Sequence, residues 1–312
     1  MPTPITRNCE RHSLRGAPHL RHGPDPGGPA PDTLLPLARS PGAQTRLSIS
    51  FGLLIALAFA LTAPGAFAEE ARSAEQLSGL DIAREADQRD VGFSDTTADL
   101  TMVLTLSPTE QVARSMRQMV LEVADDGDKS IMVFDRPRDL KGTAILTFTH
   151  RVGSDDQWLY LPALKRVKRI SSADKSGPFM GSEFAFEDLA SQEVEKYRYT
   201  YLREEECGAM ACYVVERIPV DPKSGYSRQV TWIDQQEYRL QRVDYYDRKG
   251  DLLKTMTLDG YRQYLQRHWR ADEMLMVNHQ SGKSTLLRFD NYQFQVGLQD
   301  SDFTRGALSR MR

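Results

Sequence analysis

The chain has few of the residues that metal and redox chemistry require. It contains three cysteines and six histidines among 312 residues. Beyond residue 68 these are Cys207, Cys212, His150, His268 and His279. The histidines are far apart in the sequence, with no acidic residue at the spacing of a zinc site. Neither a CxxC motif nor a twelve-residue calcium loop is present. We therefore expect no metal and no cofactor.

The chain also lacks an apolar run long enough to cross a membrane. Its longest run, Leu47 to Leu61, follows Arg46 and precedes the small-x-small sequence Ala66-Phe67-Ala68. A spanning helix needs roughly 20 apolar residues, whereas a shorter run with these flanks is typical of a secretory signal. We expect residues 46–68 to be a signal peptide, cleaved after Ala68, and the mature protein to lie in a bacterial periplasm.

Residues 1–45 lack hydrophobic periodicity. They contain nine prolines and five glycines, a composition that does not bury a core. We interpret them as a disordered extension, which an upstream start codon would explain. The remaining 244 residues, 69–312, are enough for a single domain.

An excess of positive charge is absent as well. The first 68 residues hold six Lys and Arg and three Asp and Glu, so residues 69–312 keep 34 basic and 40 acidic side chains. The net charge near −6 gives no reason to expect nucleic-acid binding.

From residue 92 onward, apolar residues mostly alternate with polar ones, as in half-buried strands. Leu100, Met102, Leu104 and Leu106 form such a series. Similar short segments recur up to Phe289, separated by tight turns, and we expect about eleven antiparallel strands. Such a succession predicts a curved sheet or barrel, mainly β, rather than a βαβ fold. Helical spacing over residues 74–90 predicts one helix before the strands, and we expect short helices near 183–192 and 302–310.

No catalytic constellation stands out. The run from Ser281 to Thr285 resembles the end of a phosphate-binding loop, but Val277 occupies the position of its first glycine. Ser172 and Lys175 have the serine–lysine spacing of penicillin-recognising enzymes, without the further motif that those enzymes carry. We expect a hairpin turn in the first case, chance spacing in the second, and no enzyme.

The most distinctive stretch runs from Asp156 to Leu189. A strand with Trp158 and Tyr160 leads into a basic run, followed by a loop rich in Ser and Gly. Phe179 and Met180 lie in that loop. Apolar loop residues beside a cationic strand suit a ligand with an apolar chain and a polar or anionic head group. An ordinary strand–loop–strand with Phe179 in the core is an equally good interpretation.

Cys207 and Cys212 are separated by four residues and flanked by strand-like runs. In an oxidising compartment they would form a disulfide across the end of a hairpin. Two free, buried cysteines are the alternative.

Three stretches resemble the LolA-like family of periplasmic outer-membrane lipoprotein-sorting proteins, especially the branch often associated with RND/MMPL-type exporters. They are LPALKRVKRIS (Leu161–Ser171), PFMGSEFAFEDL (Pro178–Leu189) and WIDQQEYRLQRVDYYDRKGDLLK (Trp232–Lys254). The resemblance covers nearly all of residues 74–310. It implies an unclosed antiparallel half-barrel with a helical lid, as in LolA, LolB and RseB, whose concavity shelters acyl chains.

Members of that family are carriers, so the resemblance implies lipid or lipoprotein acyl chains as ligands, transient membrane contact and an exporter as partner. The residues we expect to contact lipid are Leu100, Met102, Leu104, Met119, Leu121, Leu146, Trp158, Tyr160, Phe179, Met180 and Phe184. Those expected to meet a head group or an acidic partner are Lys165, Arg166, Lys168 and Arg169. A purely structural role in the core is an equally good interpretation of the strand residues. For the basic run, a strand face that simply meets solvent is favoured over a binding role.

Two other functions compete with a carrier. An RseB-like regulator would bind lipid as a signal and would also bind a membrane protein, but it would not transfer lipid between vesicles. A hydrolase built on Ser172 and Lys175 would be labelled by a serine-reactive probe.

Overall fold

In the computed structural model, residues 78–311 are described, and they begin with the helix α1 (Gly79–Asp90). Ser78 caps it in a capping box, because its hydroxyl accepts from the Asp81 amide while the Asp81 carboxylate accepts from the Ser78 amide. Its buried residues Ile82 and Ala83 face the sheet. Of the predicted helix 74–90, residues 74–77 lie outside the described part.

Antiparallel strands make up most of the described chain. Thirteen belong to one sheet, in the order β6-β5-β4-β3-β2-β1-β15-β14-β11-β10-β9-β8-β7, and β12 pairs with β13 in a separate hairpin. The strands are β1 (Asp95–Ser107), β2 (Glu110–Leu121), β3 (Lys129–Arg136), β4 (Ala144–Phe148), β5 (Asp156–Leu161), β6 (Arg166–Ile170), β7 (Tyr197–Cys207), β8 (Met210–Pro219), β9 (Tyr226–Asp234), β10 (Leu240–Asp247), β11 (Leu252–Asp259), β12 (Arg262–Tyr264), β13 (His268–Arg270), β14 (Glu273–Asn278) and β15 (Ser284–Phe294).

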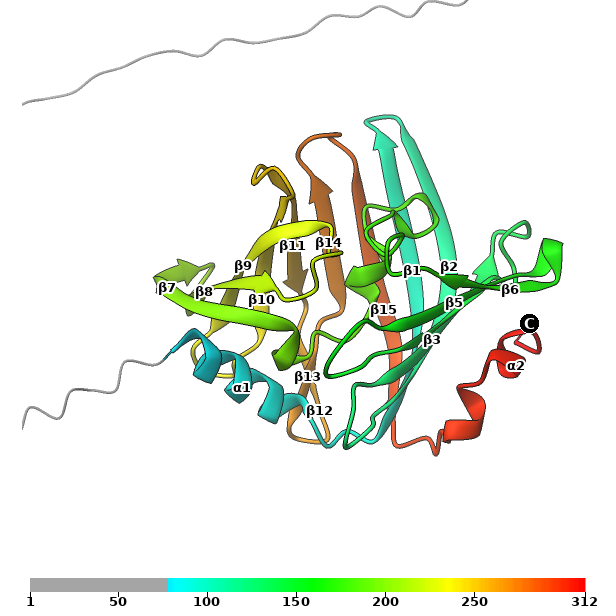
Figure 1. The fold of residues 1–312 in the computed structure, drawn as a ribbon, viewed down its shortest axis with the longest axis horizontal. Helices are drawn as coiled ribbons and strands as arrows, with labels where there is room; N and C mark the ends of the chain where they lie inside the picture. Colours follow the sequence, from blue (N-terminus) through cyan, green and yellow to red (C-terminus); the bar gives the residue numbers. More distant parts are fainter. Residues whose placement is uncertain (1–77, 312) are drawn as a thin grey trace, which may run out of the picture. The chain divides into compact units, whose positions relative to one another are not determined.

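The large sheet consists of two meanders joined along a central seam. One runs from β1 out to the edge strand β6, and the other runs from the opposite edge strand β7 back to β15. The seam pairs Leu100 with Phe289 and Leu104 with Thr285, and the two strands lie side by side in Figure 1. The edges β6 and β7 do not pair with each other, so the sheet is curved but unclosed, as predicted.

The strand count exceeds the expected eleven. The basic segment β6 and the short hairpin β12–β13 were missed, because neither shows an alternation of apolar and polar residues. The predicted helix at 183–192 is a 3₁₀ turn, Phe186–Leu189, and the C-terminal one divides into a turn, Asp300–Asp302, and α2 (Arg305–Leu308).

The two faces of the sheet are both covered. We call the concave side the inner face. It carries Leu100, Met102 and Leu104 and packs against the loop around Phe179 and Phe184. The outer face of β2 to β5 packs against Phe303 and Leu308 near the C-terminus. Figure 1 shows α1 beneath the β7–β10 side of the sheet and α2 beside β3.

Within residues 78–311, no helix has the length and apolar character needed to cross a membrane. The predicted extension 1–45 and the signal peptide 46–68 lie outside the described residues.

Candidate functional site

The loop between β6 and β7 fills part of the inner curve. Residues 175–189, which we call the plug, fold back on themselves: the Phe179 amide donates to the Phe184 carbonyl at 2.7 Å, and the Phe186 amide donates to that of Gly177 at 3.1 Å. Phe179 is 0% exposed, and its ring centroid lies 5.8 Å from that of Phe134 on β3 and 5.5 Å from that of Phe186. The plug therefore belongs to the core.

Buried polar contacts fix the other end of the plug. The Asp188 carboxylate and the Lys254 ammonium on β11 are 2.7 Å apart, with side chains 3% and 4% exposed. Lys254 also donates to the Glu183 carbonyl at 2.8 Å, and the Tyr226 hydroxyl donates to Asp188 at 2.8 Å. The side chains of Asp188, Lys254 and Tyr226 are buried. One lysine of the sheet therefore neutralises the acidic end of the plug.

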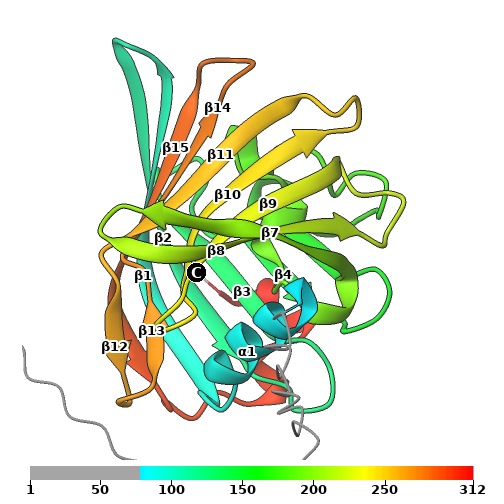
Figure 2. The ribbon, with the colours of Figure 1, turned by 90° about the vertical axis from the view of Figure 1, so that its left-hand side faces the viewer.

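A cavity of about 980 Å³ lies beside the plug, between α1 and the inner face of β7 to β10. Ala83 and Ala86 of α1 line one side, and Val215 and Ile233 of the sheet line the opposite side. The hairpin β12–β13 and the turn between β2 and β3 complete the walls, and Figure 2 shows α1 and the hairpin at one end of the sheet. This volume is at the upper end of what ligand pockets offer.

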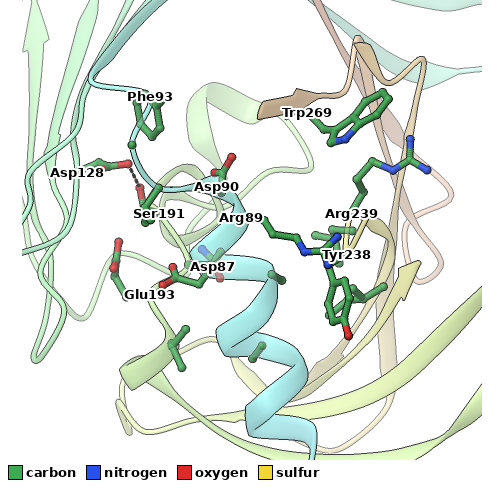
Figure 3. A pocket seen from close by; sticks show the side chains of 18 of the residues that line it. Asp87, Arg89, Asp90, Phe93, Asp128, Ser191, Glu193, Tyr238, Arg239 and Trp269 are labelled. Atoms are coloured by element: carbon green, nitrogen blue, oxygen red, sulfur yellow. Dashed lines mark hydrogen bonds between the residues drawn. The ribbon is translucent and has the colours of Figure 1, made fainter. Parts of the chain in front are cut away.

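Arginine–aromatic stacks line one side of the cavity. The Arg89 guanidinium lies 4.4 Å from the ring centroid of Tyr238, and that of Arg239 lies 4.6 Å from Trp269. Arg239 is also ion-paired with the fully buried Asp234 at 2.8 Å. Figure 3 shows these side chains on one side of α1. Each arginine of this wall therefore already has an aromatic partner.

Three carboxylates gather on the other side of α1, as Figure 3 shows: Asp87 from the helix, Asp128 from the turn before β3, and Glu193 from the segment before β7. Burial raises the pKa of Asp128 to about 6 and, helped by the charge of Asp128, raises that of Glu193 to about 7. Burial raises the pKa of Asp87 too. Arg151 and Lys196 oppose these shifts without cancelling them.

These raised pKa values predict that the stability of the protein depends on pH. A carboxyl whose pKa is raised by folding contributes stability that is complete below its unfolded pKa and is lost as the pH rises through the folded value. For Asp128 and Glu193 that window is about pH 4 to 7. At pH 8 we expect the double variant Asp128→Asn, Glu193→Gln to have a free energy of unfolding on the order of 2 kcal/mol higher than that of the wild type. This figure is reduced to allow for the partial exposure of the two side chains. Urea unfolding at pH 5 and pH 8 measures this.

Glu204→Gln, on the exposed part of β7, is the matched control and should leave the pH profile in place. His150 contributes in the same direction, because the Asp126 carboxylate 2.7 Å from its Nδ1 raises its pKa. The free energy of unfolding of the double variant should therefore still fall between pH 5 and pH 8, but less steeply than that of the wild type. An unchanged slope between pH 5 and 8 would show that the cluster does not govern stability.

The predicted lipid-contacting residues divide between the two faces of the sheet. Leu100, Met102, Leu104, Phe179 and Phe184 are buried on the inner face, and Met180 packs beside them. Met119, Leu121, Leu146, Trp158 and Tyr160 lie on the outer face instead, against the C-terminal segment. These residues were expected to line one common cavity, and the structure corrects this. The strand register sets the face: Met119 lies opposite Thr97, so it points outward and not toward Leu100 and Met102. None of these residues lines the cavity.

The other predicted residues lie away from the cavity. Lys165 lies just before β6, and Arg166, Lys168 and Arg169 are exposed on that edge strand. The disulfide joins Cys207 at the end of β7 to Cys212 on β8, across the hairpin turn.

The serine–lysine pair does not form a catalytic dyad. The Lys175 ammonium lies 2.6 Å from the Asp221 carboxylate, whereas the Ser172 hydroxyl receives a hydrogen bond from Lys223 at 3.2 Å. The general base that Ser172 would need is therefore held elsewhere.

The residues that do line the cavity were not singled out in the sequence. Asp87 and Arg89 look like the polar face of an amphipathic helix, and Trp269 lies in an undetected hairpin. The helical spacing of Leu80, Ala83 and Ala86 was the one available signal, since a helix that precedes a curved sheet is a candidate lid.

Comparisons with known proteins agree with this architecture. A family model described as an uncharacterized protein matches residues 126–310. A domain from Vibrio parahaemolyticus, described as an outer membrane lipoprotein-sorting protein, is 53% identical, with 74% of this chain and 98% of that chain covered and a TM-score of 0.73. The chain belongs to the LolA-like family.

A second relative, a DUF1329 family protein from Desulfovibrio piger, is 31% identical to this LolA-like chain, over 74% of this chain and 97% of that one, with a TM-score of 0.70. A LolA superfamily protein from Nitrosomonas europaea shares the fold at 22% identity, over 73% of this chain and 98% of that one, with a TM-score of 0.60. No curated protein matches the chain. The predicted family and its unclosed antiparallel fold are thus confirmed.

Proposed function

We propose that this LolA-like protein is a periplasmic carrier that shelters the acyl chains of a lipid or lipoprotein and moves them between the inner and outer membranes. The observation that carries the proposal is the cavity of about 980 Å³ under α1, inside the curve of the sheet. In this proposal residues 46–68 direct export, and residues 69–312 form one lipid-binding domain.

The walls of the cavity suit an amphiphile. Ala83, Ala86, Val215 and Ile233 present apolar surface, while charged side chains surround them. An acyl chain in water exposes surface worth about 0.8 kcal/mol per CH₂, so a dry compartment holds it strongly. Holding a chain in this way requires no chemistry on the ligand, in agreement with a binding rather than an enzymatic role.

The helix α1 is the element that opens or closes the cavity. Its apolar contact with the sheet rests on Ile82 against Val215 and Ile233. At its N-terminal end Gly79 packs against the β7 backbone at Thr200 and Tyr201. Polar contacts lie near its C-terminal end, such as the hydrogen bond from Arg267 to the Gln88 carbonyl at 2.7 Å. A membrane or an inner-membrane exporter of the RND/MMPL type would load and unload the cavity by displacing α1.

Native mass spectrometry with lipid extraction tests the proposal on protein recovered from the periplasm. We expect the wild type to carry an acylated molecule and Ala86→Trp, which fills the cavity from α1, to carry at least about tenfold less. Ala113→Trp, on the exposed part of β2, is the matched control and should retain the ligand.

Vesicle transfer separates a carrier from a sensor. The wild type should move a fluorescent acyl probe from donor to acceptor vesicles, and Ala86→Trp should not. A protein that holds lipid but transfers none would instead be a lipid-sensing regulator, and a protein that takes up no acyl probe would contradict lipid binding altogether.

A further inference from the structure

The strand β6 ends the large sheet with an open edge. It pairs with β5 alone, from Leu161 opposite Arg166 to Gln157 opposite Ile170. A strand with one partner leaves the backbone amides and carbonyls of its outer side available for another strand. Arg166, Val167, Lys168 and Arg169 are all exposed, so no described part of the chain covers this edge.

The charge of this edge has one sign. No acidic residue occurs between Asp156 and Asp174, while four basic residues occur from Lys165 to Arg169. Arg169 is ion-paired with Asp156, and within residues 78–311 no ion pair involves the other three. Gly142 lies close to Pro162 and Met311, so the exposed Lys141 and Arg310 lie near the turn that joins β5 to β6. In a chain of net charge −3, this concentration favours an acidic partner.

Apolar side chains are exposed among these charges. Leu164 is 63% exposed and Val167 is 37% exposed. Edges that merely avoid aggregation combine charge with little apolar surface. The opposite edge strand, β7, has mixed charge, with Arg203 ion-paired to Glu205 on the same strand. The two edges therefore differ, and only β6 combines one sign of charge with accessible apolar residues.

The cations point to both sides of the sheet. Lys168 lies opposite Leu159, which faces inward, and Arg169 lies opposite Trp158, which faces outward. A flat membrane surface would best be met by cations on one face, whereas a peptide lying along the edge contacts both.

We propose that the β6 edge binds, by strand addition, an extended acidic segment of a partner protein, whose backbone pairs with Arg166–Ile170 and whose apolar side chains meet Leu164 and Val167. This interaction is independent of the ligand in the cavity. The paired segment is short, so binding is weak and reversible, and salt weakens it further.

The test uses the purified protein and a synthetic peptide of about seven residues that alternates Glu and Val. We expect fluorescence anisotropy to show binding and hydrogen exchange to show protection at residues 166–170. The variant Lys165→Glu, Arg166→Glu, Lys168→Glu should weaken binding at least tenfold. Arg198→Glu, on the exposed β7 edge, is the control and should not. Methylating alternate peptide amides should abolish binding, because it removes the donors of the added strand.

Three results would overturn the proposal: no binding of the acidic peptide, equal binding of the N-methylated peptide, or binding without protection of β6. Vesicles of phosphatidylglycerol and phosphatidylethanolamine provide the remaining comparison. If they bind the protein through the same three cations while the peptide does not, the edge contacts an anionic membrane rather than a strand.

Discussion

Replacing Lys254 with methionine is expected to lower the free energy of unfolding by about 3–5 kcal/mol, because it leaves the Asp188 carboxylate buried without a cation. Methionine has a similar length and keeps the apolar contacts of the stem. The lost contacts are the 2.7 Å ion pair and the 2.8 Å hydrogen bond to the Glu183 carbonyl. Urea unfolding measures the loss, and limited proteolysis should show earlier cleavage within the plug.

Two further variants isolate the role of charge. Lys249→Met, in the exposed turn after β10, should change stability by less than about 0.5 kcal/mol. Asp188→Asn added to Lys254→Met removes the orphaned charge and keeps an acceptor for Tyr226 or the Ala185 amide, so it should recover part of the loss. If that double variant were no more stable than Lys254→Met alone, the buried charge would not be the cause.

Truncating Phe179 to alanine is expected to cost a similar amount, about 3–5 kcal/mol, because a fully buried aromatic ring leaves a void that the surroundings fill only in part. The ring is enclosed by Phe134 and Phe186, which belong to the sheet and to the plug. Thermal or urea unfolding of the purified protein measures the effect.

Phe179→Leu, which keeps most of the volume, should cost clearly less, and Leu164→Ala on the exposed surface should cost less than about 0.5 kcal/mol. The same variants decide what Phe179 does. If Phe179→Ala left stability unchanged and reduced lipid uptake, the residue would contact the ligand rather than hold the plug.

The strands could be predicted because their residues alternate, but their faces could not. In β3, Ile131, Met132, Val133 and Phe134 are all buried. The plug covers one side of this strand, and the C-terminal segment covers the other. Because neither side of β3 faces solvent, its residues do not alternate between polar and apolar, and no such pattern marks which of them point inward. The predicted lining therefore mixed Leu100 with Leu146, which point in opposite directions.

The distinctive motif was located from the sequence, but its role in the fold was not. Gly-flanked Phe179 resembles an exposed loop residue until the loop is seen to fold back into the concavity. The partner of Asp188 is Lys254, far away in the sequence and unremarkable in its strand. The cavity escaped prediction for a similar reason, since its walls come from α1, strands β7 to β10, the β12–β13 hairpin and several loops that are far apart in the sequence. Only the fold brings these segments together.

The seam between β1 and β15 also governs how the chain folds. Within each meander, neighbouring strands lie close together along the chain, with only the short β12–β13 hairpin between β11 and β14. Their pairing therefore closes short loops. The seam instead brings residue 100 opposite residue 289, and closing so long a loop is entropically unfavourable until the meanders exist. We therefore expect the seam to form late in folding. Until it forms, the two halves expose unpaired strand edges, and the folding chain is most prone to aggregate during that interval.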